Sequence, residues 1–127
     1  MWALDLNAGF PALERSCPAV KGAALNMTDS TTVNTLVERI RIESSKIDVL
    51  VNNAGITRDA MIQKMTDTDW DAVINVNLKG VFIMTGAVVP IMMEAGKGSI
   101  VSIRSIVGLD GNIGQTNYAA TKGGRYP

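Results

Sequence analysis

Residues 47–55 read Ile-Asp-Val-Leu-Val-Asn-Asn-Ala-Gly, a mainly apolar run that ends in two asparagines, an alanine and a glycine. We predict a strand over residues 47–51 that ends at Asn52. A strand of this kind is typically buried on both faces by flanking helices, and such strands pair in parallel. The stretch therefore predicts an α/β fold, with a small-residue turn just after a buried strand.

Short apolar runs alternate with longer amphipathic ones along the rest of the chain. Strands are expected at residues 2–6, 20–25 and 99–103, with a short helix or turn over 9–17. A helix that Asp29 or Ser30 can cap carries one apolar stripe, formed by Val33, Leu36, Val37 and Ile40. Strands that alternate with helices of this length imply right-handed βαβ crossovers and a doubly wound parallel sheet.

A long helix is predicted after Thr66 and Asp69, which have the spacing of a capping box. Asn77 interrupts its apolar face, Pro90 is expected to bend it, and Gly96 and Gly98 to end it. The apolar side chains of this face are Trp70, Val73, Ile74, Val81, Met84 and Val88.

Composition limits the classes of function. The 127 residues, 46% of them apolar, predict one domain with a buried core. Lys plus Arg and Asp plus Glu both number 12, so no net charge attracts nucleic acid or an anionic membrane. Cys17 is the single cysteine and there is no histidine, which excludes an internal disulfide, a serine-histidine hydrolase and His- or Cys-ligated metal sites.

The chain shows no secretion signal, and Gly86, Pro90 and Glu94 break its longest apolar stretches. We therefore expect a cytoplasmic protein that binds no membrane.

Tyr118 and Lys122 lie four residues apart in a predicted helix that starts at Asn117, after a loop over residues 105–116. Positions i and i+4 share one face of a helix, so the lysine ammonium would lie beside the phenol and favour its ionised form. A tyrosine in that setting suits carbonyl reduction or alcohol oxidation. The pair alone is also common on solvated helices.

Four motifs occur in order: Asn52-Asn-Ala-Gly55, Asn75-Val-Asn-Leu-Lys-Gly80, Ser105, and Tyr118-Ala-Ala-Thr-Lys122. With Ser105 thirteen residues before Tyr118, the chain resembles the short-chain dehydrogenases/reductases over roughly residues 1–124. Within that family it is most similar to the 3-oxoacyl-[acyl-carrier-protein] reductases and the acetoacetyl-CoA reductases.

The resemblance implies an oxidoreductase that moves a hydride between a nicotinamide and a carbonyl or alcohol. Tyr118 would pass the proton, Ser105 would hydrogen-bond the reacting oxygen, and Lys122 would lower the tyrosine pKa and hold the nicotinamide ribose. Asn77 would bind a water in a proton relay. Plainer alternatives stay open: Ser105 can cap a turn, and Asn77 can bond a neighbouring helical carbonyl as a buried amide.

Ligands of such sheets bind beyond the carboxyl ends of the strands. Asp5 would accept hydrogen bonds from the adenosine ribose and repel a 2′-phosphate, which favours NAD over NADP, although it can equally be a solvated strand-end residue. The resemblance places Asn26 and Met27 at the adenine, where Asn26 replaces the usual aspartate; an Asx turn would serve Asn26 as well. The Asn53-Ala54-Gly55 turn would let the backbone approach the cofactor closely.

Parts of the family pattern are missing. No T-G-x-x-x-G-x-G loop is present, the sequence starts at what resembles the second strand, and Arg125-Tyr-Pro127 departs from the family pattern. We expect a single, partial Rossmann-like dinucleotide-binding domain over residues 1–127, truncated at both ends. The neighbours of the missing strand would then have unpaired edges.

Two functional hypotheses follow. The chain is an NAD- or NADP-dependent reductase of a 3-oxoacyl thioester, or of a similar small-molecule carbonyl. Alternatively, it is a catalytically silent fragment that acts through protein association. In either case, helix Trp70 to Glu94 would pair with its counterpart in a homo-oligomer.

Overall fold

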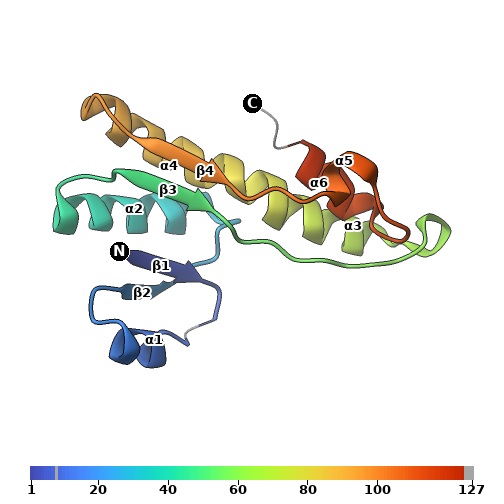
Figure 1. The fold of residues 1–127 in the computed structure, drawn as a ribbon, viewed down its shortest axis with the longest axis horizontal. Helices are drawn as coiled ribbons and strands as arrows, with labels where there is room; N and C mark the ends of the chain where they lie inside the picture. The colour runs from blue at the N-terminus through green and yellow to red at the C-terminus, as the bar shows by residue number, and fades with distance from the viewer. Residues whose placement is uncertain (8, 125–127) are drawn as a thin grey trace.

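The computed structural model describes residues 1–7 and 9–124, so the departure at residues 125–127 lies outside the described residues. The chain is α/β, as expected (Figure 1). In chain order its elements are β1 (Trp2–Asp5), α1 (Phe10–Ser16), β2 (Lys21–Ala24), α2 (Ser30–Ser44), β3 (Val49–Asn52), η1 (Ile62–Lys64), α3 (Asp67–Ile74), η2 (Asn75–Lys79), α4 (Gly80–Glu94), β4 (Ser99–Ser102), α5 (Val107–Asp110) and α6 (Thr116–Gly123).

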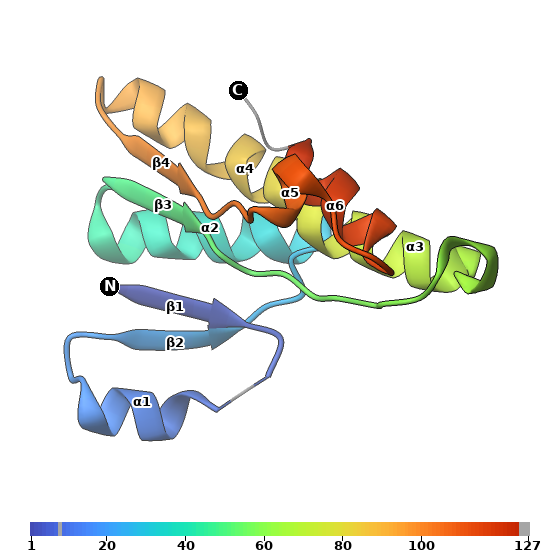
Figure 2. The same ribbon diagram turned by 45° about the vertical axis from the view of Figure 1, so that its right-hand side comes forward.

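The strands form two parallel pairs rather than one sheet. β1 pairs with β2 from Trp2↔Lys21 to Asp5↔Ala24, and β3 pairs with β4 in the register Val49↔Ser99. Within the described residues, β1 and β3 do not pair with each other. All four strands point the same way in Figures 1 and 2, so their carboxyl ends share one side of the molecule. Within that part of the chain, the expected unpaired strand edges are thus present at β1 and β3.

Helices cover both faces of the first pair and one face of the second. Phe10 of α1 lies directly over Gly22, whereas Ala23, which points the other way, packs against the core. That core joins α2 and α4 to Leu50 of β3. Trp2 and Leu4 of β1 also pack against it. The two strand pairs are thus held together mainly by side-chain packing against α2.

The prediction that the strand at residues 47–51 is buried on both faces was wrong, and the strand near residues 99–103 is largely exposed too. Val49 and Val51 are each 54% exposed, and Ile100, Val101 and Ile103 are exposed as well. Leu50 and Asn52 point toward the helices and are buried. A continuous apolar run shows that a strand can be buried on both faces. It does not show which of the two faces the described residues cover.

Helix α2 follows its predicted cap and stripe. Asp29 accepts hydrogen bonds from the backbone N–H groups of Thr31 and Thr32, and the last turn ends at Ser45, whose φ is 61°. The buried side chains are the four predicted ones, Val33, Leu36, Val37 and Ile40. Glu43 near the end of α2 accepts hydrogen bonds from Lys21 of β2 and from Arg39, which ties the helix to the strand.

The helical stretch from Asp67 to Glu94 contains a feature that was not predicted. Thr66 caps it as expected, accepting from the N–H of Asp69 at 3.1 Å. At residues 75–79 the hydrogen bonding widens to a π-helical turn, in which the N–H of Gly80 reaches the carbonyl of Asn75. Such turns insert one extra residue and shift the side chains that follow. Here the turn surrounds Asn77.

By length and composition, Asp67–Glu94 meets the criteria for a membrane-crossing helix, the single such helix in the described part of the chain. The interruptions at Gly86 and Pro90 do not end α4, so they do not exclude a span by themselves. Met84, Val88 and Met92 are buried against α2, but only 28% of the apolar window of this helix is buried. The absence of membrane binding stays a prediction.

Acid is expected to weaken the fold through α2. Hydrogen bonds from the Thr32 hydroxyl and the Thr31 backbone lower the pKa of Asp29, and Lys21 and then Arg39 lower the pKa of Glu43. A carboxyl with a depressed folded-state pKa stabilises the fold above its unfolded pKa of about 4 and loses that contribution as the pH falls through the folded value. Thermal unfolding should therefore show a falling Tm below about pH 4.

The matched variants are Asp29→Asn, which keeps a capping oxygen that does not titrate, and Asp29→Ala, which removes the cap. The difference in Tm between wild type and Asp29→Ala should shrink on acidification. The difference in Tm between Asp29→Asn and Asp29→Ala should stay constant. A constant wild-type advantage from pH 7 to 3 would contradict a titrating cap.

Candidate functional site

The carboxyl ends of the strands bring the predicted residues to one side of the fold. Asp5 and Asn26 follow the first strand pair, and Asn53, Ala54 and Gly55 follow β3. Ser105 comes three residues after the last residue of β4. Helix α6, which carries Tyr118 and Lys122, lies against α3, η2 and α5 at the same side (Figure 2).

Lys122 connects the segment after β4 to the tyrosine. Its side chain is buried, and its Nζ donates to the carbonyl oxygen of Ile103 at 3.0 Å. The same Nζ lies 5.5 Å from the centroid of the Tyr118 ring, within the range of a cation–π contact. A buried ammonium requires such partners. The predicted i, i+4 relation of Tyr118 and Lys122 is therefore present, and it lies beside the backbone two residues before Ser105.

Ser105 opens a short helix that was not predicted, because residues 105–116 were expected to be a loop throughout. Its Oγ accepts from the N–H of Val107 at 3.3 Å, and its carbonyl accepts from the N–H of Gly108 at 3.0 Å. The turn-capping alternative is thus realised. That bond uses the hydroxyl as an acceptor and leaves the hydroxyl proton able to donate elsewhere. Ser105 also lines a shallow cavity of about 300 Å³ with Arg104, Ile106 and Leu109.

Helix α5 reaches α6 only because residue 108 has no side chain. A Cβ atom at Gly108 would lie 2.6 Å from the carbonyl carbon of Lys122 and 2.7 Å from the nitrogen of Gly123. Both distances are well inside van der Waals contact with backbone atoms. The sequence Ser105-Ile-Val-Gly108 therefore fixes how closely the serine segment approaches the lysine.

Asn77 is fully buried, and hydrogen bonds join its side chain to two other segments. Its Oδ1 accepts from the N–H of Ile56 at 2.8 Å, and its Nδ2 donates to the carbonyl of Ile56 at 2.9 Å and to Oγ1 of Thr121 at 3.3 Å. The side chain thus bonds the segment after β3 and helix α6, and the expectation of a buried amide is confirmed. A Cβ at Gly55 would lie 3.2 Å from its Oδ1, so glycine at position 55 makes room for this amide. The water relay stays a prediction.

Two further polar residues of α6 are buried, and sequence reasoning missed both. Asn117 donates through Nδ2 to the carbonyls of Arg58 at 2.9 Å and Asp69 at 3.3 Å, and accepts from the N–H of Tyr118 at 2.7 Å. Thr121 donates to the carbonyl of Tyr118 at 2.8 Å. Their spacing of four residues, each one position before Tyr118 or Lys122, was the signal available in the sequence.

The predicted adenosine-side residues show local contacts. Asp5 is exposed and accepts from the N–H of Asn7 at 2.8 Å. Asn26 accepts from the N–H and hydroxyl of Thr28 at 3.1 and 2.8 Å, which is the Asx-turn alternative. Met27 is half-buried with its side chain against Gly80. The exposed Asn53-Ala54-Gly55 turn remains accessible, so cofactor contact by these residues stays a prediction.

A second hollow on the surface lies away from the tyrosine. It has a volume of about 480 Å³ and is lined by residues of β2 and α2, among them Thr35 and Arg39. Its walls bring together no acid, base and nucleophile of the kind that catalysis requires. Within the described ranges, no group of three or more His, Cys, Asp or Glu side chains could hold a metal.

Comparison with known proteins points to one family. A sequence model of short chain dehydrogenases matches residues 6–125. The 3-oxoacyl-[acyl-carrier-protein] reductase FabG of Thermotoga maritima is 58% identical over 100 residues, 79% of this chain and 41% of the relative. Its counterpart in Escherichia coli K12 is 47% identical over 104 residues, 82% of this chain and 43% of the relative. That of Chlamydia trachomatis is 41% identical over 128 residues, 98% of this chain and 52% of the relative.

These alignments cover most of this chain but only about half, or less, of each relative. The resemblance found in the motifs is confirmed.

Gly108→Ala should weaken the contact between α5 and α6. The added methyl group meets backbone atoms that cannot rotate away, so we expect a loss of about 1–3 kcal/mol in the free energy of unfolding. Urea denaturation measures it.

The matched control is Gly86→Ala in α4, where a Cβ would meet nothing within 4 Å. That variant should gain about 0.5–1 kcal/mol, because alanine favours a helix interior over glycine. Equal effects at the two positions would contradict the close α5–α6 approach.

Proposed function

Because this chain belongs to the short-chain dehydrogenase family, we propose that it acts as an NAD(P)-dependent oxidoreductase on a 3-oxoacyl thioester. The observation that carries this proposal is the Lys122 ammonium, held between the Tyr118 ring and the backbone that leads to Ser105. The names of the relatives support the substrate class, since each is a reductase of a 3-oxoacyl group on an acyl carrier protein. A small-molecule thioester offers the same carbonyl.

The residues at the strand ends fit part of a nicotinamide dinucleotide. The Asp5 carboxylate is exposed at the end of β1 and keeps acceptor capacity beyond its bond to Asn7, as ribose hydroxyls require. Its negative charge supports NAD over NADP, because it would repel a 2′-phosphate. Asn53, Ala54 and Gly55 present an exposed turn with little side-chain bulk. Asn26 and Met27 lie next to the same strand pair, where the adenine is proposed to bind.

When bound, the nicotinamide supplies or accepts the hydride at the substrate carbon. Tyr118 donates its phenolic proton to the carbonyl oxygen during reduction and takes it back during oxidation. Ser105 donates its hydroxyl proton to the same oxygen and stabilises the charge that develops there. Lys122 holds its positive charge beside the Tyr118 ring and supplies N–H donors for the ribose. Asn77 would hold a water that returns the proton from solvent.

Tyr118→Phe should lower kcat by about 10²–10⁴-fold, because the proton donor is lost while the ring remains. The assay follows oxidation of NADH or NADPH with acetoacetyl-CoA, and cofactor fluorescence should show that binding is retained. Ser105→Ala should also lose activity, whereas the matched control Ser102→Ala, within β4, should keep it.

Full activity of Tyr118→Phe would remove the phenol from the mechanism. No saturable binding of either dinucleotide, even at millimolar concentration, would favour the catalytically silent alternative.

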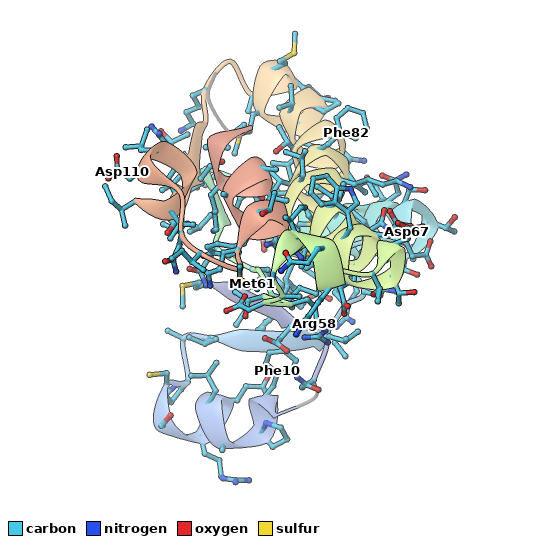
Figure 3. The ribbon with its side chains drawn as sticks, turned by 90° about the vertical axis from the view of Figure 1, so that its right-hand side faces the viewer. Phe10, Arg58, Met61, Asp67, Phe82 and Asp110 are labelled. Carbon is cyan, nitrogen blue, oxygen red and sulfur yellow. The ribbon has the colours of Figure 1, made fainter. Side chains whose placement is uncertain are left out.

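We also propose that the chain forms a homo-oligomer through helix Trp70 to Glu94. Phe82 and Met93 of α4 are each 75% exposed, and Phe82 extends away from the fold in Figure 3. Large apolar side chains on one helix are typical of a protein interface. The balanced charge gives no field that would attract nucleic acid, so we propose that the partner is a second copy of this chain and that both lie in the cytoplasm.

Phe82→Asp should reduce association, because burying the new carboxylate in an apolar contact is costly. Analytical ultracentrifugation should show the shift toward monomer as a rise of at least about tenfold in the dissociation constant, the change that roughly 1.4 kcal/mol produces. The matched control is Ile42→Asp in α2, equally apolar and 71% exposed but outside the proposed face. An unchanged mass distribution for Phe82→Asp would exclude this interface.

A further inference from the structure

We infer that Asn117 and Thr121 are positioning residues, which lock helix α6 in the one orientation that places Tyr118 and Lys122 beside the segment leading to Ser105. This inference rests on the proposed function for its catalytic consequence. The locking itself follows from the hydrogen bonds of the two side chains and can be tested without turnover.

Helix α6 carries the anchoring residues and the proposed catalytic residues on two neighbouring faces. Asn117 and Thr121 are four residues apart and so share one face, and Tyr118 and Lys122 share the face about 100° further round. Asn117 and Thr121 are both fully buried. Because each buried residue directly precedes a residue of the Tyr–Lys pair, a rotation of the helix that breaks the first pair must also move the second.

Asn117 fixes the first turn of α6 to two other segments. Its Nδ2 uses one N–H for the carbonyl of Arg58, in the segment before η1, and lies 3.3 Å from the carbonyl of Asp69 in α3. Its Oδ1 accepts from the N–H of Tyr118, which is among the first helical N–H groups and has no acceptor within the helix. Aspartate has the same shape but cannot donate to two carbonyl oxygens.

Thr121 fixes the next turn in a different direction. Its hydroxyl donates to the carbonyl of Tyr118 and accepts from Nδ2 of Asn77, which is itself bound to Ile56. The two bonds run through one oxygen atom, so a residue without a hydroxyl loses both. Valine has nearly the same shape as threonine and therefore isolates the hydrogen bonds from the packing.

The two attachments have a consequence beyond stability. A helix held at one point can pivot, but one held at successive turns to separate segments cannot. The 3.0 Å hydrogen bond from Lys122 Nζ to the carbonyl of Ile103, in the segment that leads to Ser105, then depends on residues that touch neither substrate nor cofactor. Misplacement of reacting groups by about 1 Å can cost about 10²-fold in rate.

The decisive variants are Thr121→Val and Thr121→Ser, with Thr116→Val, exposed on the same helix, as the control. Thr121→Val should lower kcat by about 10–10²-fold with little change in KM, and Thr121→Ser should restore it. Asn117→Asp should act in the same direction as Thr121→Val. Urea denaturation of each variant identifies any that fail to fold, and if Thr121→Val does so, Asn117→Asp carries the test.

The structural readout uses nuclear Overhauser contacts between the Lys122 side chain and Ile103, which lies outside α6 and accepts the lysine hydrogen bond. They should be present in wild type, lost in Thr121→Val and regained in Thr121→Ser. If wild type shows these contacts but no turnover, the proposed function fails and this locking role stands. Unchanged contacts in a folded Thr121→Val protein would overturn the inference, and so would a loss of kcat that the serine variant does not restore.

Discussion

The buried amide of Asn77 is the interaction on which the arrangement of the site depends. An amide without partners in a protein interior costs about 1–3 kcal/mol, so its surroundings must supply both donors and acceptors. Here they come from both backbone groups of Ile56 and from the Thr121 hydroxyl. One side chain therefore fixes the distance between the segment after β3, the π-helical turn and α6. The small residue at position 55 and the widened turn at residues 75–79 both accommodate it.

The two strand pairs serve different parts of the proposed chemistry. β1 and β2 carry Asp5 and Asn26 at their carboxyl ends, whereas β3 and β4 lead to the Asn53–Gly55 turn and to Ser105. No strand pairing joins the two pairs within residues 1–7 and 9–124, and α2 links them by packing against both. The relative placement of the adenosine side and the reaction side therefore depends on apolar contacts of α2. The polar network around Asn77 holds only the reaction side.

Much of the fold was predictable because local chemistry determined it. The Asp29 and Thr66 caps and the stripe of α2 follow from single side chains and from helical periodicity, and all are present. The exposure of Val49 and Val51 could not be predicted, because an apolar run has the same pattern whether one face or both are covered. Helix α5 was missed since its length of four residues gives no periodic signal, and Gly108 read as a loop residue.

In the candidate site, too, contacts within one helix were predictable and contacts between distant segments were not. The spacing of Tyr118 and Lys122 gave their shared face correctly, because that relation lies within one helix. The hydrogen bonds of the buried amides and of Thr121 join residues far apart in the chain. Asn117 and Arg58 are 59 positions apart, Asn77 and Thr121 are 44 apart, and Asn77 and Ile56 are 21 apart. No local sequence pattern encodes such pairs. Contacts of Asp5, Asn26 and Ser105 with neighbouring backbone explain their local roles without excluding the proposed ones.

The most direct measurement is amide hydrogen exchange at Ile56, a residue outside every helix and strand whose N–H donates to Oδ1 of Asn77. If the buried amide organises the site, this N–H exchanges slowly in wild type and becomes fast in Asn77→Ala, together with the amides of α6. Exchange at Ile56 as fast in wild type as in an unstructured peptide would contradict the account.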